Sequence, residues 1–96
     1  MKLLMALVPS ECLEHAQRVI EAHDIHAYSE IPRVLGAGRG GRKLGTRAFP
    51  GMSSMLLVIA DNEESERVVD ALRDTAEETG CLTGIRVFAL PAESVL

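Results

Sequence analysis

The hydrophobic residues of this chain fall into short continuous runs and into stripes with helical spacing. Residues 3–8 and 55–59 are uninterrupted apolar runs of strand length, and residues 85–90 form a third stretch of mainly apolar character. Continuous runs of this length predict strands that are covered by other parts of the protein. Pro9 and Pro91 follow the first and last stretches, and each ends its strand because proline has no N–H to donate.

Two segments between these runs have helical periodicity. Along residues 11–23 and again after Asp61, apolar side chains recur at steps of three and four residues, which predicts one buried stripe on each helix. The stripes consist of Leu13, Ala16, Ile20 and His23 in the first segment and of Val68, Val69, Leu72 and Ala76 in the second. Ser10, and either Asp61 or Asn62, are the predicted N-caps, and Gly80 is the predicted left-handed C-cap.

The remaining segments complete a β-α-β, loop, β-α-β order. Residues 26–35 read as an extended stretch that Pro32 bends or places at a sheet edge. Residues 36–51 carry six of the eight glycines, so we expect no regular element there. This order predicts an α+β, ferredoxin-like βαβ-βαβ sandwich, with a four-stranded antiparallel sheet and two helices on one face. The uncovered apolar face of that sheet favours association of subunits.

Length and composition limit the chain to one small domain, residues 1–96. It has 47% hydrophobic residues, and no stretch approaches the roughly 20 apolar residues of a membrane span. The apolar opening resembles a signal sequence but ends too early at Pro9, so we expect a cytoplasmic protein. Two cysteines, Cys12 and Cys81, are too few for a secreted disulfide scaffold, and we expect free thiols.

Charge is distributed unevenly along the chain. The net charge is −4, yet Glu30 and Asp61 enclose a window with five basic and no acidic residues. The rest of the chain therefore carries −9. A basic loop on an acidic body indicates a local anion site or a docking loop, with a merely solvated loop as the alternative. The acidic balance and the scarcity of aromatic residues disfavour a nucleic-acid partner.

The glycine-rich segment matches a phosphate-binding pattern only in part. Residues 36–41 satisfy G-x-G-x-x-G, but Gly45 and Pro50 prevent the helix that a dinucleotide fingerprint requires. A P-loop is excluded because Arg42 and Lys43 follow Gly41. Glycine N–H groups beside arginine side chains still suit a phosphate or an acidic partner.

Metal binding and catalysis have weaker support in the sequence. Cys12 and His15 lie one helical turn apart, and His23 and His26 flank the far end of the same helix. The two pairs are separated by roughly 15 Å, because a helix rises 1.5 Å per residue, so they cannot share one ion within a subunit. Asp61 and its acidic neighbours are explained by helix capping, and no local signature of a catalytic triad is present.

Four segments of the chain resemble the PII-like signalling family. Residues 1–9 look like the family's first strand with its terminal proline, and residues 34–39 are similar to the V-x-G-x-G-R segment at the base of its T-loop. Residues 49–51 resemble the return from the T-loop into the third strand. Residues 79–84 look like the T-G-x-I-G-D-G turn called the B-loop. The resemblance runs over nearly all of the chain.

The resemblance implies a compact homotrimer that holds an adenine nucleotide in clefts between subunits. The T-loop of such a protein signals nucleotide occupancy to a partner such as a transporter or a metabolic enzyme. The implied phosphate contacts are Gly36, Gly38, Arg39, Gly40, Thr83 and Gly84, with Tyr28 or Ser29 near the adenine. Arg42, Lys43 and Arg47 are the implied partner-docking residues of the loop.

Departures from the family pattern narrow this expectation. Gly40 replaces the glutamine that helps nitrogen regulators to hold Mg²⁺ and 2-oxoglutarate. The B-loop segment lacks the aspartate and the lysine of the family pattern, because Ile85 directly follows Gly84. Each missing charge-assisted contact is worth about 1.5–3 kcal/mol, which favours AMP or ADP over ATP. The short T-loop without tyrosine disfavours uridylylation.

We therefore predict a non-enzymatic sensor of adenine nucleotides, with 2-oxoglutarate or bicarbonate open as a second ligand. A metal-binding trimer, similar to divalent-cation tolerance or metal-efflux-associated PII-like proteins, is the alternative. A third possibility is a structural trimer whose basic loop contacts only an acidic surface.

Overall fold

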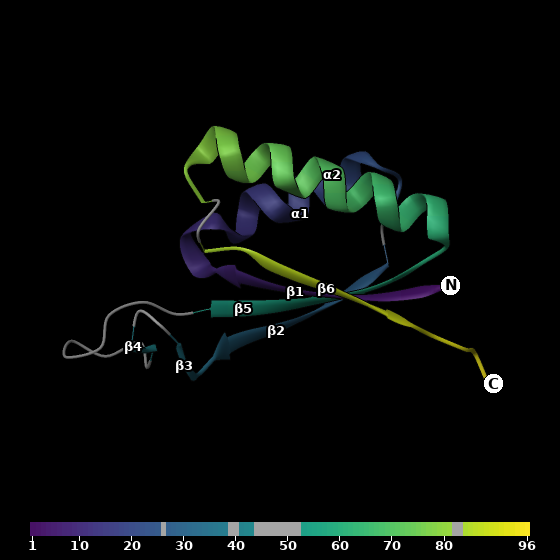
Figure 1. Ribbon diagram of the computed structural model, residues 1–96, viewed down its shortest axis with the longest axis horizontal. Helices are drawn as coiled ribbons and strands as arrows, with labels where there is room; N and C mark the ends of the chain where they lie inside the picture. Colours follow the sequence, from purple (N-terminus) through teal and green to yellow (C-terminus); the bar gives the residue numbers. More distant parts are fainter. Residues whose placement is uncertain (26, 39–40, 44–52, 82–83) are drawn as a thin grey trace.

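Four strands form one antiparallel sheet, and two helices cover one of its faces (Figure 1). The computed structural model describes residues 1–25, 27–38, 41–43, 53–81 and 84–96. The sheet has the order β2-β5-β1-β6, with all three neighbouring pairs antiparallel. The elements are β1 (Lys2–Pro9), a 3₁₀ turn (Ser10–Cys12), α1 (Leu13–Ala22), β2 (Tyr28–Val34), β3 (Gly36–Gly38), β4 (Gly41–Lys43), β5 (Ser53–Ala60), α2 (Asn62–Thr79) and β6 (Arg86–Pro91). This arrangement confirms the predicted fold class.

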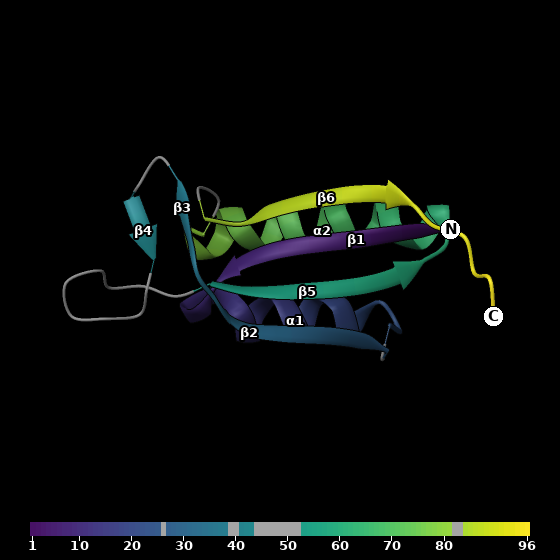
Figure 2. The same cartoon turned by 90° about the horizontal axis from the view of Figure 1, so that it is seen from below.

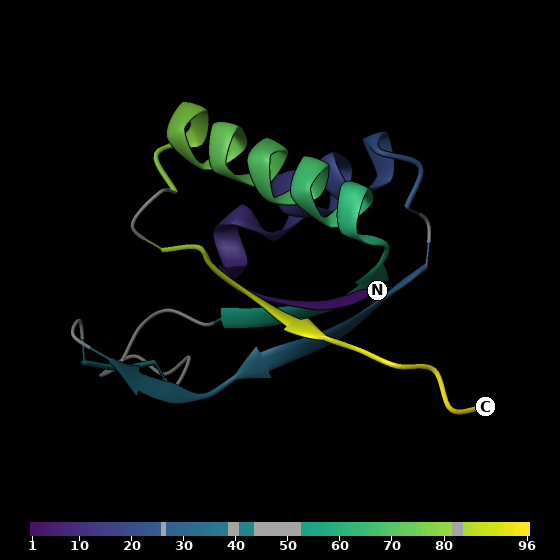
Figure 3. The same ribbon diagram turned by 45° about the vertical axis from the view of Figure 1, so that its right-hand side comes forward.

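The core lies in a single layer between the sheet and the two helices (Figure 3). Successive side chains of a strand point to opposite faces, so alternate residues of the two central strands meet the helices. The buried members are Leu4, Ala6 and Val8 of β1, Leu56, Val58 and Ala60 of β5, Ala16 and Ile20 of α1, and Val68, Leu72 and Ala76 of α2. Every apolar position predicted for the helix stripes is buried or packs against this cluster, except His23, which is half-buried.

The helix ends agree with the sequence prediction at α2 and differ at α1. Asp61 is the N-cap of α2, and its Oδ1 accepts a hydrogen bond from the Glu64 N–H at 2.7 Å, which lowers the pKa of Asp61. Gly80 closes α2 with φ 77°, as predicted. The predicted Ser10 cap is wrong: the chain leaves β1 through Pro9 directly into the 3₁₀ turn, so Cys12 occupies the N-cap position of α1.

The other face of the sheet carries a continuous apolar surface, which we call the open face. Leu57, Met5 and Phe88 lie side by side across this face, because the register pairs Met5 with both of the other residues. Phe88 is 55% exposed and Ile59 54% exposed, although both are large and apolar. The full set is Leu3, Met5, Leu7, Ile31, Met55, Leu57, Ile59, Phe88 and Leu90. Contiguous exposed apolar surface of this kind is typical of interaction sites.

The end of β2 is bent, as the sequence predicted from Pro32. The register with β5 shifts between Ile31 and Val34, and Arg33 has φ 59°, which is rare for a residue with a side chain. A bulge at an edge strand re-aims the chain. Beyond it the chain enters β3, which pairs with β4.

The β3–β4 hairpin corrects the expectation that residues 36–51 hold no regular element. Gly36 pairs with Lys43 and Gly38 with Gly41. Ala37 pairs with Arg42 between these two pairs, so β3 and β4 form a short antiparallel ladder. Part of the segment therefore forms a short hairpin.

Candidate functional site

The segments predicted to contact phosphate converge at one end of the sheet. β1 and β2 end there, and β5 and β6 begin there, because neighbouring strands are antiparallel. Figure 2 shows the β3–β4 hairpin beyond this end, on the same side as the start of β6. We call it the loop end of the sheet, defined by Pro9, Val34, Ser53 and Gly84.

A turn at the loop end is organised by one backbone carbonyl. Cys81 O accepts hydrogen bonds from the Gly84 N–H at 2.9 Å and from the Ile85 N–H at 3.1 Å. Gly84 also lies against the end of β1: a Cβ at this position would be 2.5 Å from Pro9 Cγ. We use the name Cys81–Ile85 turn for the described residues Cys81, Gly84 and Ile85. Gly84 packs directly on the end of β1, and glycine is needed for this close approach.

Replacing Gly84 with alanine should destabilise the protein through crowding. The Pro9 ring is closed onto its backbone and cannot rotate away, so the turn must shift, at a cost of about 1–3 kcal/mol. Gly80→Ala is the matched control: there φ 77° costs about 1 kcal/mol, but the new Cβ meets no atom within 4 Å. Urea unfolding of both variants measures the difference, and a smaller loss for Gly84→Ala than for Gly80→Ala would contradict a close packing of Gly84 on Pro9.

Cys12 and Cys81 form a disulfide, so the expectation of free thiols is wrong. The two residues are 69 positions apart, and their Cα atoms lie 6.6 Å from each other. The fold brings them together because the 3₁₀ turn after β1 and the residue after Gly80 meet at the loop end. Sequence spacing carries no sign of this contact, since neither cysteine belongs to a short redox motif.

The two residues predicted near the adenine lie at the opposite end of β2 from the glycine segment. Tyr28 and Ser29 pair with Val58 and Leu57, whereas Val34 pairs with Ser53 at the loop end. Tyr28 faces α1, and its hydroxyl donates to Glu21 Oε1 at 2.9 Å, a bond that raises the pKa of Tyr28. Ser29 faces the other way, onto the open face. Within one subunit neither residue can reach Gly84.

The remaining predicted residues lie in the β3–β4 hairpin, in the Cys81–Ile85 turn or outside the described part of the chain. Gly36 and Gly38 are in β3, and Arg42 and Lys43 are in β4, so the hairpin places all four beyond the loop end. Gly84 lies in the Cys81–Ile85 turn. The predictions for Arg39, Gly40, Arg47 and Thr83 fall outside the described residues.

Arg86 is a basic residue that the sequence reasoning did not select. It begins β6 two residues after Gly84, is exposed, and pairs with Leu7, so it lies on the open-face side of the loop end. Its Nη1 donates to Ile85 O at 3.3 Å. The sequence signal for Arg86 was its position just after Gly84, at the start of the predicted last strand.

The described part of the chain offers no cluster of three metal-ligating side chains. Cys12 is held in the disulfide and so cannot act as a thiolate ligand in this state. His15 is exposed and His23 half-buried, whereas His26 falls outside the described residues. No described helix is long and apolar enough to cross a membrane.

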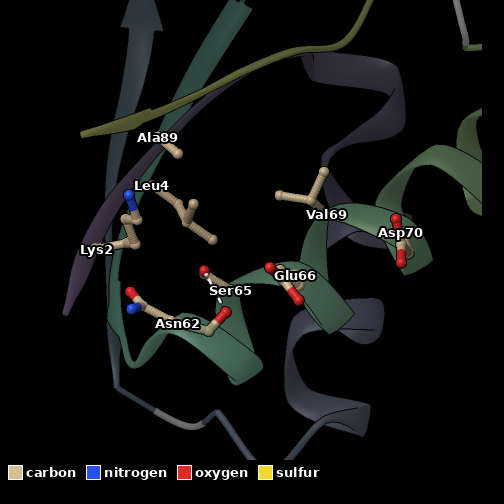
Figure 4. Close-up of a pocket in the computed structure, with 8 residues that line it drawn as sticks. All are labelled: Lys2, Leu4, Asn62, Ser65, Glu66, Val69, Asp70 and Ala89. Atoms are coloured by element: carbon tan, nitrogen blue, oxygen red, sulfur yellow. Dashed lines mark hydrogen bonds between the residues drawn. The ribbon is translucent and has the colours of Figure 1, made fainter. Parts of the chain in front are cut away.

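A cavity of about 540 Å³ lies at the other end of the sheet (Figure 4). Lys2 and Leu4 of β1, Ala89 of β6 and the first turns of α2 line it. Ser65 in its wall donates to Asn62 O at 3.0 Å. The cavity contains none of the residues predicted to bind nucleotide and is separated from the loop end by the length of β1.

Comparison with known proteins identifies the family to which this fold belongs. The chain belongs to the family described as nitrogen regulatory protein P-II, whose pattern matches residues 1–96. A comparison with curated protein sequences gives no match.

Solved structures of CPII, a nitrogen regulatory PII-like protein from Thiomonas intermedia K12, have the same fold. The form bound to ADP, AMP and bicarbonate has a TM-score of 0.74 at 15% identity, covering 93% of this chain and 82% of that one. The form bound to ADP and bicarbonate gives a TM-score of 0.68 at 17% identity, with the same coverage. The apo form gives 0.69 at 12% identity, covering 93% and 85%.

Proposed function

We propose that this protein is a non-enzymatic regulator that binds AMP or ADP between subunits at the loop end of the sheet. One observation carries the proposal: the glycines of β3, the Cys81–Ile85 turn and Arg86 converge at a single end. Family membership supports a regulatory role, and the ADP and AMP bound to the CPII structures support the ligand class. Bicarbonate, which is also bound there, is the candidate second ligand.

The proposed site is completed by a second subunit. Ser29 lies at the far end of β2 from the loop end, so a base contact from it must come from a neighbouring chain. The open face supplies the means of association, since it presents a large apolar surface to solvent in the single chain. We therefore propose a homotrimer with one nucleotide site at each of its subunit boundaries.

Phosphate recognition in this proposal combines backbone and side-chain donors. Glycines let the backbone approach an anion closely, and the guanidinium of Arg86 provides charge-assisted hydrogen bonds. A site with few cations suits one or two phosphate groups better than three. Residues of the basic loop, among them Arg42 and Lys43, would then contact a cytoplasmic partner such as a transporter or a metabolic enzyme.

Calorimetric titration with AMP, ADP and ATP tests the proposal directly. Arg86→Gln should weaken ADP binding about tenfold or more, because a hydrogen bond to a charged group is worth about 1.5–3 kcal/mol. Arg67→Gln is the matched control: Arg67 is also exposed, but it lies in the first turns of α2 at the other end of the sheet. Arg39→Ala, chosen from the sequence, should weaken binding to a similar degree.

Three results would count against the proposal. The absence of heat and of a thermal shift at millimolar nucleotide would overturn the ligand. Equal losses in the Arg86 and Arg67 variants would move the phosphate away from the loop end. Tightest binding of ATP would overturn the preference for one or two phosphate groups.

A further inference from the structure

The disulfide joins the two segments that hold the loop end together. Cys12 is the last residue of the 3₁₀ turn after β1 and the N-cap of α1. Cys81 follows the C-cap of α2 and supplies the carbonyl that accepts the Gly84 and Ile85 N–H groups. One covalent bond therefore ties the carbonyl that organises the Cys81–Ile85 turn to the fixed end of β1.

We propose that Cys12–Cys81 is a reversible redox site that clamps the Cys81–Ile85 turn, and that its reduction by a dithiol weakens nucleotide binding. The second half of this statement rests on the proposed function. The first half concerns the protein alone and can be measured without any nucleotide.

Accessibility indicates which sulfur reacts first. Cys12 is 3% exposed, whereas Cys81 is only half-buried. Thiol–disulfide exchange requires a thiolate to approach one sulfur of the bond in line, so attack is favoured at the cysteine that is less buried as a residue. The incoming reductant therefore reacts at Cys81 Sγ, and Cys12 is the leaving group.

A dithiol reductant supplies the two electrons and two protons that the exchange requires. Its first thiolate bonds to Cys81 Sγ, the Sγ–Sγ bond breaks, and the electron pair leaves on Cys12, which takes up a proton. The second thiol of the reductant then loses its proton and attacks the reductant's own sulfur in the mixed disulfide, releasing Cys81 as a thiolate that is protonated. The protein gains two electrons and two protons, and the dithiol becomes a disulfide.

The position of Cys12 favours its departure as a thiolate. Cys12 precedes the ten-residue helix α1, whose amino end carries partial positive charge, although the Leu13 N–H already donates to Ser10 O. Glu11 and Glu14, also near this end, oppose the effect from exposed positions, where solvent screens them.

Reduction removes the constraint but not the local hydrogen bonds. The Gly84 and Ile85 N–H groups would still bond to Cys81 O, but that carbonyl would no longer be tied covalently to the end of β1. Among the described residues of the turn, the packing of Gly84 on Pro9 and of Ile85 against the core would remain. A turn that is ordered for a smaller fraction of the time binds its ligand with an affinity lowered by that fraction.

Amide hydrogen exchange of the nucleotide-free protein tests the clamp itself. After treatment with dithiothreitol, thiol titration should give two thiols per chain, and the Gly84 and Ile85 amides should exchange about tenfold faster than in the oxidised protein. Amides of β5 should change less. The double variant Cys12→Ser, Cys81→Ser should show the fast exchange with or without reductant. Equal protection of Gly84 and Ile85 in the two redox states of the wild type would overturn the clamp.

Calorimetry with ADP on the same samples separates this proposal from the proposed function. Weaker binding to the reduced wild type by about fivefold or more, with full recovery on reoxidation and no redox effect on the double variant, supports the switch. ADP binding that is equal in both states leaves the proposed function standing and overturns the redox control. If neither state binds ADP, the proposed function fails, and so does the redox control of nucleotide binding. The amide hydrogen exchange result still decides whether the disulfide clamps the turn.

Discussion

A glutamate at position 5 is expected to convert the assembled protein into a folded monomer. Met5 lies at the centre of the open face, between Leu57 of β5 and Phe88 of β6. In the single chain this position is half-buried and faces solvent, so a carboxylate there can be hydrated. In an assembly that covers the open face, the same carboxylate would be buried without a partner.

The expected loss of association is large. Removing an ion from water without pairing it costs several kcal/mol even after relaxation, and every subunit of the assembly brings one such charge. Each 1.4 kcal/mol lowers an association constant tenfold, so a penalty of about 4 kcal/mol per subunit lowers it roughly a thousandfold for each. Like charges that meet in the interface add to this penalty.

Light scattering coupled to size-exclusion chromatography and sedimentation velocity measure the change in assembly mass. Circular dichroism checks that Met5→Glu keeps its secondary structure. Ala22→Glu is the matched control, because Ala22 is exposed at the end of α1 and faces away from the sheet. The wild type and the control should have the mass of a trimer. A trimeric Met5→Glu variant, or a monomeric wild type at micromolar concentration, would contradict an interface on the open face.

Most of the fold could be predicted from the sequence, because the residue pattern of each segment favours the same element that the packing of the whole domain requires. The apolar runs around Leu4 and Leu56 form the two central strands, and Pro32 lies in a strand that is bent and stands at the sheet edge, as predicted. The sequence alone was least informative where a turn is defined by distant contacts. Ser10 suits a helix cap by residue type, but the exit from β1 through Pro9 places it in a 3₁₀ turn.

The candidate site was predicted only in part, for a related reason. Glycine-rich segments such as residues 36–41 are visible in a sequence, because few other residues permit such backbones. The disulfide and the packing of Gly84 on Pro9 depend on segments that the fold brings together, about 70 residues apart along the chain. The position of Arg86 just after the glycine turn was visible in the sequence, but its place at the loop end follows only from the register of β6 with β1.

Reduction of the Cys12–Cys81 disulfide is expected to lower the free energy of unfolding by about 4 kcal/mol. The bond closes a loop across a separation of 69 residues, and the constraint that it places on the unfolded chain grows with the logarithm of the loop length. For a domain of this size, that loss corresponds to a fall in Tm of roughly 15–30 °C. Small domains have unfolding free energies of about 5–15 kcal/mol, so the reduced protein should remain folded at 25 °C.

Urea titrations of the oxidised and reduced wild type measure this difference, and the double variant Cys12→Ser, Cys81→Ser should match the reduced protein under both conditions. The slope of the transition adds a second test. A cross-linked unfolded chain exposes less surface than a free one, so the oxidised protein should have the smaller m-value. Equal midpoints and equal slopes in the two redox states would show that the cysteines are not linked in solution. A large fall in stability with unchanged exchange at Gly84 would instead make the bond a purely structural cross-link, because it would then act on the unfolded chain without holding the Cys81–Ile85 turn.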